Sequence, residues 1–269
     1  MLKKRILTAA VLIPVTLLAL FFLPTPGFFI FTGIISLGAA WEWSNLMQLK
    51  TIRTRFIYVI ISAIVFVWAA TLPVFVLFSN TFLWWLVATW LVITYPQKSQ
   101  WWQKSMIARG LMGLFAIAPC FVALNLMREQ RDGIYSLLFV LLLIWGADTA
   151  AYFSGKKWGS TKMAPRVSPN KTMQGLYGAL IFSVLFAMLA LWFFHLPYSM
   201  WVWAILLSIV TVIFSIIGDL FESMMKREAG LKDSGKLLPG HGGLLDRIDS
   251  LLSAAPIFVL GGLLLSKLA

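Results

Sequence analysis

The sequence predicts an all-α protein, a polytopic transmembrane helical bundle of about nine spans. Hydrophobic residues make up 60% of the 269 residues and charged residues only 12%, a balance that excludes an ordinary soluble domain with a polar exterior. About nine apolar segments have, or nearly have, the roughly 20 residues that a helix needs to cross the bilayer core. The polar stretches between them are short, so we expect a single transmembrane domain over residues 1–269.

The expected spans follow the apolar runs in chain order. The first run resembles a signal peptide, but it ends in Pro24-Thr-Pro-Gly rather than a small-residue cleavage site, so we expect it to be retained. The fourth run is short for a span, and we expect it to be tilted or partly interfacial. The predicted limits are 6–23, 27–47, 56–78, 81–95, 107–127, 134–154, 175–194, 200–221 and 250–267.

The basic residues predict how these spans are oriented. If the N-terminus is cytoplasmic, alternate loops place 19 of the 22 lysine and arginine residues on the cytoplasmic side, as the positive-inside bias requires. The C-terminus then lies on the opposite side. This topology also accounts for the formal net charge of +12, which on a soluble domain would suggest nucleic acid. No nucleic-acid partner is expected.

The chemistry-bearing residues concentrate in the second half of the chain. Residues 1–133 are typical of generic apolar spans, whereas residues 134–269 are expected to form the catalytic half, with cytoplasmic loops at 155–174 and 222–249. The second loop contains the one long polar passage, SMMKREAGLKDSGKLLPGHGGLLDRID. Hydrocarbon cannot solvate its charges, so the passage must lie in water or in a wet cavity at the membrane surface.

Carboxylates from distant parts of that half converge on one depth. The topology puts six acids at or near the cytoplasmic boundary, where a functional role is favoured over a structural salt bridge. They are Asp148, Asp219, Glu222, Asp233, Asp246 and Asp249. Four carboxylates supply the oxygen ligands that Mg²⁺ prefers and leave room for phosphate oxygens. We therefore expect Mg²⁺ with a phosphorylated substrate, and a second cation is compatible with the carboxylate count. Asp249 has a plainer alternative role as a cap of the last helix.

Basic and glycine residues of the same passage complement a phosphate. Lys226, Arg227 and Arg247 can neutralise phosphate charge, and the glycines beside His241 let the backbone approach an anion closely.

The loop at 155–174 ends where the seventh span is expected to start. Its Ser168, Asn170, Lys171 and Thr172 offer hydroxyl, amide and ammonium groups beside a helix N-terminus, a place suited to phosphate. An ordinary helix-start turn explains the same spacing equally well.

The polar passage resembles the signature of the phosphatidate cytidylyltransferases, also called CDP-diacylglycerol synthases. The resemblance continues upstream through Gly146-Ala-Asp148-Thr and Ser168-Pro-Asn-Lys-Thr, so it covers the C-terminal half in detail. The matching positions of the passage are Ser223, Lys226, Arg227, Lys232, Asp233, Pro239, His241, Gly242, Gly243, Asp246, Arg247 and Asp249.

The resemblance implies that CTP and phosphatidate react to give CDP-diacylglycerol and pyrophosphate, with Mg²⁺. It also implies a multi-pass protein of the bacterial inner membrane, with a homodimer as one possible assembly. In that membrane, the topology derived from the basic residues places the C-terminus in the periplasm and the active site toward the cytoplasm. The family's metal-binding acids carry over to Asp219 and Asp246, with Asp249 and Asp148 as further candidates.

Phosphatidate is already an anion, so we expect catalysis to rest on charge neutralisation and in-line positioning. In this hypothesis Lys226, Arg227 and Arg247 stabilise charge on the transferring and leaving phosphates, and His241 donates a hydrogen bond to a phosphate. The candidate substrate-binding residues are Ser168, Asn170, Lys171, Thr172, Ser223, Lys232, Asp233, Gly242 and Gly243.

Two other functions compete with this hypothesis. A transporter or flippase of an anionic lipid would have ionisable residues near mid-bilayer and an internal repeat, whereas these acids gather at one edge. A transferase acting on another lipid phosphate, such as a polyprenyl phosphate, would keep the same site. Glu42 stays open, because snorkelling between Trp41 and Trp43 explains it as well as a site role does.

Overall fold

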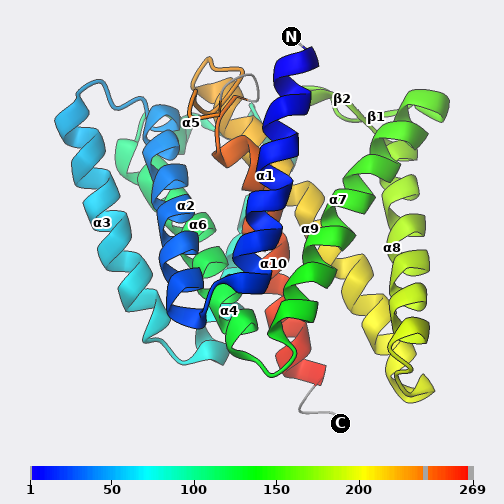
Figure 1. The fold of residues 1–269 in the computed structure, drawn as a ribbon. Helices are drawn as coiled ribbons and strands as arrows, with labels where there is room; N and C mark the ends of the chain where they lie inside the picture. The colour runs from blue at the N-terminus through cyan, green and yellow to red at the C-terminus, as the bar shows by residue number, and fades with distance from the viewer. Residues whose placement is uncertain (1, 239–241, 266–269) are drawn as a thin grey trace.

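The computed structural model describes residues 2–238 and 242–265, which form a bundle of long helices (Figure 1). The start of α1, α5 and the strands β1 and β2 lie at one end of the bundle, and the end of α10 lies at the other. The long helices are α1 (Leu2–Phe22), α2 (Thr25–Leu46), α3 (Ile52–Ala70), α4 (Val74–Thr94), α6 (Met106–Glu129), α7 (Gly133–Trp158), α8 (Met173–Phe193), α9 (Trp201–Glu228) and α10 (Leu245–Leu265). The short elements are α5 (Gln100–Gln103), β1 (Lys162–Ala164), β2 (Ser168–Thr172) and a 3₁₀ turn at Tyr198–Met200.

Seven of the described helices are long and apolar enough to cross a membrane: α3, α4, α6, α7, α8, α10, and α9 together with the turn before it. The all-α, polytopic membrane class is therefore confirmed. α1 contributes a shorter apolar stretch, Ala10–Phe22, and α2 is not among the seven. The count of nine spans and the orientation of the termini stay predictions.

The predicted limits of the third and fourth spans were wrong. α3 ends at Ala70 and α4 begins at Val74 after Pro73, because the residue before a proline is disfavoured in a helix. The sequence analysis placed the break near Asn80. That side chain instead donates to the carbonyl of Val76 (2.8 Å) inside α4. α4 therefore has 21 residues and is not a short span.

The two connections predicted as cytoplasmic loops within residues 134–269 are shorter than expected, and the first contains two strands. β1 and β2 form an antiparallel hairpin with Lys162 opposite Thr172, which amends the all-α expectation. α7 runs to Trp158 and α9 to Glu228, so the loops predicted at 155–174 and 222–249 begin later than expected. The second loop also ends earlier, at the start of α10, and we call residues 229–244 the α9–α10 segment.

Asp249 does not cap the last helix. α10 starts at Leu245, so Asp249 lies inside its first two turns, and its Oδ1 accepts from the N–H of Ser250 (2.7 Å). The predicted capping role was therefore wrong.

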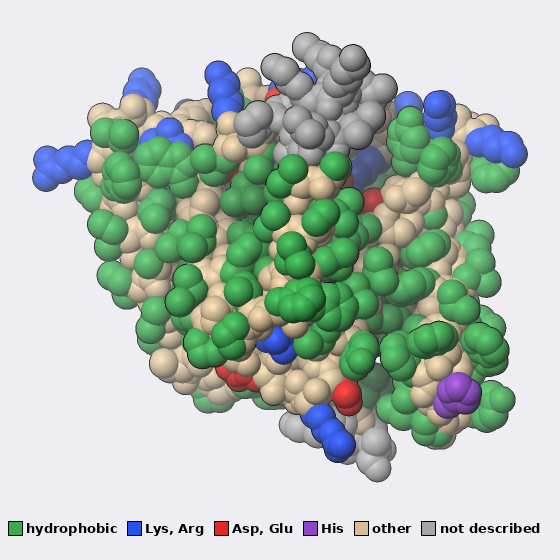
Figure 2. All heavy atoms as spheres, viewed as in Figure 1, with side chains coloured by type: hydrophobic (Ala, Val, Ile, Leu, Met, Phe, Trp, Pro, Cys, Tyr) green, Lys and Arg blue, Asp and Glu red, His purple; other side chains and the backbone are tan. Residues whose placement is uncertain are grey.

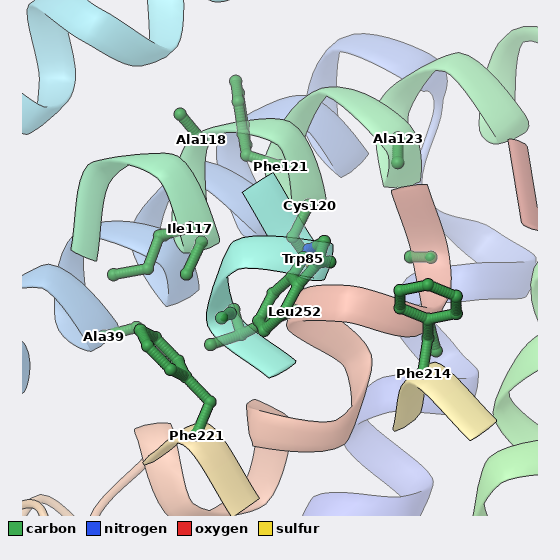
Figure 3. Packing of buried hydrophobic residues seen from close by; sticks show 14 of the residues in the cluster. Ala39, Trp85, Ile117, Ala118, Cys120, Phe121, Ala123, Phe214, Phe221 and Leu252 are labelled. Atoms are coloured by element: carbon green, nitrogen blue, oxygen red, sulfur yellow. The ribbon is translucent and has the colours of Figure 1, made fainter. Parts of the chain in front are cut away.

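An aromatic cluster fixes the C-terminal half of α9 in the bundle core (Figure 3). The ring of Phe221 stacks on Trp43 with a centroid distance of 5.9 Å and meets Trp84 and Trp85 edge-on at 5.7 and 5.6 Å. Such pairs contribute about 0.5–1.5 kcal/mol each beyond their buried area. Close to them, α9 and α10 approach at Gly218, where a Cβ atom would overlap Ser253. The polar side chains of α9 and α10 near this level are thus held on rigid, closely packed helices.

Lysine and arginine side chains gather at the end of the molecule that carries the N-terminus, and fewer lie at the other end (Figure 2). We call this the basic end. The hairpin and the α9–α10 segment lie there (Figure 1).

Candidate active site

Two cavities meet near the basic end. One has a volume of about 540 Å³, is lined by polar side chains of β2, α7, α9 and α10 together with the start of α8, and is called here the polar cavity. The other has about 450 Å³, lies among α1, α2, α6, α7 and α10 with a mostly apolar lining, and is called the apolar cavity. The residues that line both are Asp148, Asp246, Arg247, Asp249 and Ser250.

The polar cavity brings together most of the charged residues expected at the site. All four predicted metal-binding acids line it, although they come from three helices, whereas Glu222 and Asp233 line neither cavity. Asn170, Lys171 and Thr172 of β2 line the same space. The structure therefore brings these four acids together with the loop predicted at 155–174.

Lys171 of β2 supplies the counter-charge of Asp219 on α9. The ammonium of Lys171 lies 2.7 Å from Oδ2 of Asp219, and both side chains are about a quarter exposed, at 24% and 29%. Oδ1 accepts from the hydroxyl of Ser223, one helical turn along, at 3.3 Å. Lys171 thus joins the hairpin to α9 at the wall of the cavity, where it can also reach an anion.

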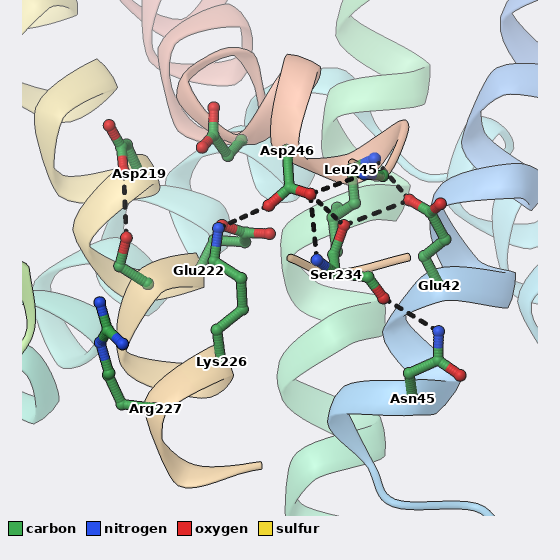
Figure 4. A network of polar contacts seen from close by, with 12 residues as sticks. Glu42, Asn45, Asp219, Glu222, Lys226, Arg227, Ser234, Leu245 and Asp246 are labelled. Atoms are coloured by element: carbon green, nitrogen blue, oxygen red, sulfur yellow. Dashed lines mark hydrogen bonds and ion pairs between the residues drawn. The ribbon is translucent and has the colours of Figure 1, made fainter. Parts of the chain in front are cut away.

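Lys226 bridges two carboxylates (Figure 4). Its Nζ lies 2.5 Å from Oδ1 of Asp246 and also makes an ion pair with Glu222 on its own helix. The Glu222 side chain is fully buried. A buried charge of this kind is tolerated only with a partner. The Lys226 ammonium therefore neutralises a carboxylate on each helix and joins α9 to α10. It lines neither cavity, so the structure does not place it against a phosphate.

The other oxygen of Asp246 is surrounded by donors. Oδ2 accepts from the backbone N–H of Ser234 (3.0 Å), the hydroxyl of Ser234 (3.0 Å) and the N–H of Gly243 (2.8 Å). Gly242 has φ of 81°, a conformation that glycine adopts at little cost. The two predicted glycines therefore bring the backbone against the Asp246 carboxylate.

Arg227 contacts backbone rather than the cavity. Its Nε donates to the carbonyl of Val167 (3.2 Å) at the turn of the hairpin, so this residue ties α9 to the element that carries Lys171. Thr172 lines the polar cavity and also caps α8, because its Oγ1 accepts from the N–H of Gly175 (3.1 Å). Both interpretations of that turn thus apply to Thr172.

Residues 3–264 match the family model described as the cytidylyltransferase family. The chain belongs to this family. A phosphatidate cytidylyltransferase of Haemophilus influenzae is 39% identical to it, over 96% of this chain and 97% of the relative. Those of Pseudomonas aeruginosa and Brucella suis are 41% and 34% identical, over 96% and 99% of this chain and 96% and 95% of the relatives. The resemblance seen in the sequence is confirmed.

Some predicted residues of this cytidylyltransferase lie outside both cavities. Ser168 begins β2 away from them, and Lys232 and Asp233 are exposed on the α9–α10 segment. His241 lies outside the described residues. Their assigned roles in binding substrate stay predictions.

Asn45 and Ser234 are site residues of the cytidylyltransferase that no sequence signal predicted, and the role of Glu42 was left open. Glu42 and Asn45 on α2 bind the α9–α10 segment, and Ser234 of that segment binds Asp246. Glu222, one of the acids expected near this boundary, binds the Lys226 ammonium. A carboxylate near the end of an apolar helix is itself a signal of function, and it applied to Glu42 and Glu222.

The aspartate oxygens that line the polar cavity of the cytidylyltransferase are the kind of ligand that a hard cation such as Mg²⁺ prefers. Among residues 2–238 and 242–265, no three His, Cys, Asp or Glu side chains are grouped closely enough to hold a metal ion. Asp219 and Asp246 are held by ammonium groups instead. A cation at these acids would therefore compete with Lys171 and Lys226.

Proposed function

We propose that this cytidylyltransferase transfers CMP from CTP to phosphatidate in the membrane, giving CDP-diacylglycerol and pyrophosphate. One observation carries the proposal: a polar and an apolar cavity meet at the same five residues. The charged side chains of the polar cavity suit a nucleoside triphosphate, and the apolar lining of the other cavity suits acyl chains. The two substrates of the named relatives combine these chemistries.

The reaction joins two anions at the place where the cavities meet. A phosphate oxygen of phosphatidate forms a bond to the α-phosphorus of CTP, and the bond from that phosphorus to the pyrophosphate oxygen breaks. Arg247 lines both cavities and can reduce the repulsion between the two phosphates. Lys171 can add a second positive charge from the hairpin. Positioning and charge stabilisation of this kind supply most of the rate in phosphoryl transfer.

Mg²⁺ stays part of the proposal. Asp219 and Asp246, with Asp249 and Asp148, would hold it and any second cation at the polar cavity. When bound, it would neutralise charge on the CTP phosphates.

The decisive experiment supplies the purified protein with labelled CTP, phosphatidate and Mg²⁺. We expect labelled CDP-diacylglycerol, no product after chelation with EDTA, and recovery when Mg²⁺ is added back. Product formed with polyprenyl phosphate but not with phosphatidate would establish the other transferase instead. Transport of phosphatidate across vesicles without any lipid-linked CMP would contradict the enzyme altogether.

The apolar cavity is expected to hold the acyl chains. Thr16 of α1 lines it, so Thr16→Trp should raise KM for long-chain phosphatidate about tenfold, because overfilling a binding pocket costs about 1–3 kcal/mol. The KM for CTP should stay unchanged. The neighbouring Val15 is 43% exposed and does not line the cavity, so Val15→Trp is the matched control. Equal KM values for the two variants would contradict this location.

We also propose that all nine long helices span the membrane and that the basic end faces the cytoplasm. Lys236 on the α9–α10 segment and Asp132 before α7 are both exposed. Lys236→Cys should react with an impermeant maleimide only from the cytoplasmic side, and Asp132→Cys only from the periplasmic side. The native Cys120 is 3% exposed and adds little background. Labelling of both cysteines from one side would overturn the topology. The homodimer stays a prediction of the family resemblance.

A further inference from the structure

Glu42 joins the N-terminal half of the chain to the α9–α10 segment (Figure 4). It lies on α2 and is 1% exposed. Its Oε2 accepts from the N–H of Leu245 (2.8 Å) and lies 3.3 Å from the hydroxyl of Ser234, whose single hydrogen is shared between Glu42 and the closer Asp246 oxygen. Its Oε1 accepts from the N–H of Leu237 (3.4 Å). The N–H of Leu245 is the first of α10, which no intrahelical carbonyl can pair. A carboxylate 203 positions earlier in the sequence therefore caps the helix that carries Asp246.

The backbone of the segment is shaped to this carboxylate. A Cβ atom at Gly235 would overlap the carboxylate of Glu42, and one at Gly243 would overlap the Ser234 hydroxyl. Asn45, one turn further along α2, adds a second attachment, because its Nδ2 donates to the carbonyl of Ser234 (2.9 Å). Ser234 is thus held from α2 at both its side chain and its carbonyl.

The same serine orients Asp246. Its N–H and its hydroxyl both point at Oδ2 of Asp246, which leaves Oδ1 turned toward Lys226. Glu42 itself lines neither the polar nor the apolar cavity, so it acts on the site only through its neighbours.

We propose that Glu42 is a positioning residue of the cytidylyl transfer: it holds Ser234 and the start of α10 so that the Asp246 carboxylate keeps one orientation at the polar cavity. The proposal rests on the proposed function. It assigns a role in the reaction to the N-terminal half, which sequence analysis treated as generic spans. A glutamine has nearly the size of glutamate, but its amide NH₂ group can only donate. At position 42 this group would face a hydrogen-bond donor that a Glu42 oxygen now accepts from, so Gln cannot replace Glu here.

The test compares Glu42→Gln with Glu129→Gln, a change at an exposed carboxylate at the far end of α6. Glu42→Gln is expected to lower kcat about 30-fold, as hydrogen bonds to a charged group are lost. The KM for phosphatidate should stay within about twofold. Trypsin cleavage at the exposed Lys232 and Lys236 should accelerate. Glu129→Gln should change none of these.

A double-mutant cycle separates positioning from general packing. Ser234→Ala should also lower kcat, and the double variant with Glu42→Gln should lose little more than either single one, because both act on Asp246 through the same contact. A purely structural role would lower the melting temperature and the amount of folded protein and leave kcat per folded molecule unchanged. That result, or additive losses in the cycle, would overturn the proposal.

Gly235 gives a second route to the same contact if Glu42→Gln does not accumulate in the membrane. Gly235→Ala should lower kcat in the wild-type background and much less in a Glu42→Ala background, where the overlapping carboxylate is absent. Equal costs in both backgrounds would overturn the proposal. If the wild-type protein makes no CDP-diacylglycerol at all, the proposed function fails, and this outcome is distinct from an active wild-type enzyme with an equally active Glu42→Gln variant.

Discussion

Asp246→Asn is expected to lower the rate of CDP-diacylglycerol synthesis about 10³-fold, because losing one group that stabilises charge in a transition state costs about 10²–10³ in kcat. Its two oxygens have different partners: Oδ2 accepts three hydrogen bonds, and Oδ1 faces the Lys226 ammonium. An asparagine can present only one oxygen. Its amide group would therefore point either at Lys226 or at the donors of Ser234 and Gly243, and the lost charge would leave the site less able to hold a cation.

The measurement is kcat for purified variants at matched protein amount, with the melting temperature of each. Asp132→Asn, at an exposed aspartate outside α10 and the site, is the control and should retain wild-type turnover. Retention of more than about a tenth of the activity by folded Asp246→Asn would remove Asp246 from the reaction, because the loss of a charge that the transition state needs cannot leave the rate so nearly unchanged.

The membrane class of the fold could be predicted because hydropathy acts over whole segments. An apolar run such as α8 must be buried in lipid or in protein, and no local detail changes that. Boundaries depend on single residues. The break between α3 and α4 was missed because Asn80 is polar in sequence, yet its amide is satisfied by the helix's own backbone. The hairpin was missed because its ladder pairs residues of a short polar stretch that carries no strand periodicity.

The site could be predicted in part for a related reason. Asp148, Asp219, Asp246 and Asp249 are ionisable residues on apolar helices, and each is conspicuous alone. Their partners depend on which helices touch. The contacts of Glu42 with Ser234 and Leu245 join residues 192 and 203 positions apart, so no local pattern shows them. The sequence also suggested that Lys226 faces phosphate, whereas the packing of α9 on α10 turns it toward Glu222 and Asp246.

Lys226→Met is expected to have the largest effect on stability. Without the ammonium, the Glu222 carboxylate would be left fully buried, and the described residues offer its two oxygens no hydrogen-bond donor. Asp246 would lose its counter-charge at the same time. Leaving a buried charge unpaired costs about 3–5 kcal/mol. Thermal unfolding of the purified variant should show a midpoint lowered by roughly 10 °C, with CDP-diacylglycerol synthesis abolished.

A double variant separates the two roles of this lysine. Lys226→Met combined with Glu222→Leu replaces the α9 pair with apolar groups, a change that is often neutral or stabilising, so the unfolding midpoint should return close to the wild-type value. Activity should stay low, because Asp246 still lacks the ammonium that faces its Oδ1. If activity returned with stability, Lys226 would serve only to neutralise Glu222. If the single variant kept the wild-type midpoint, the bridging position of Lys226 would be wrong.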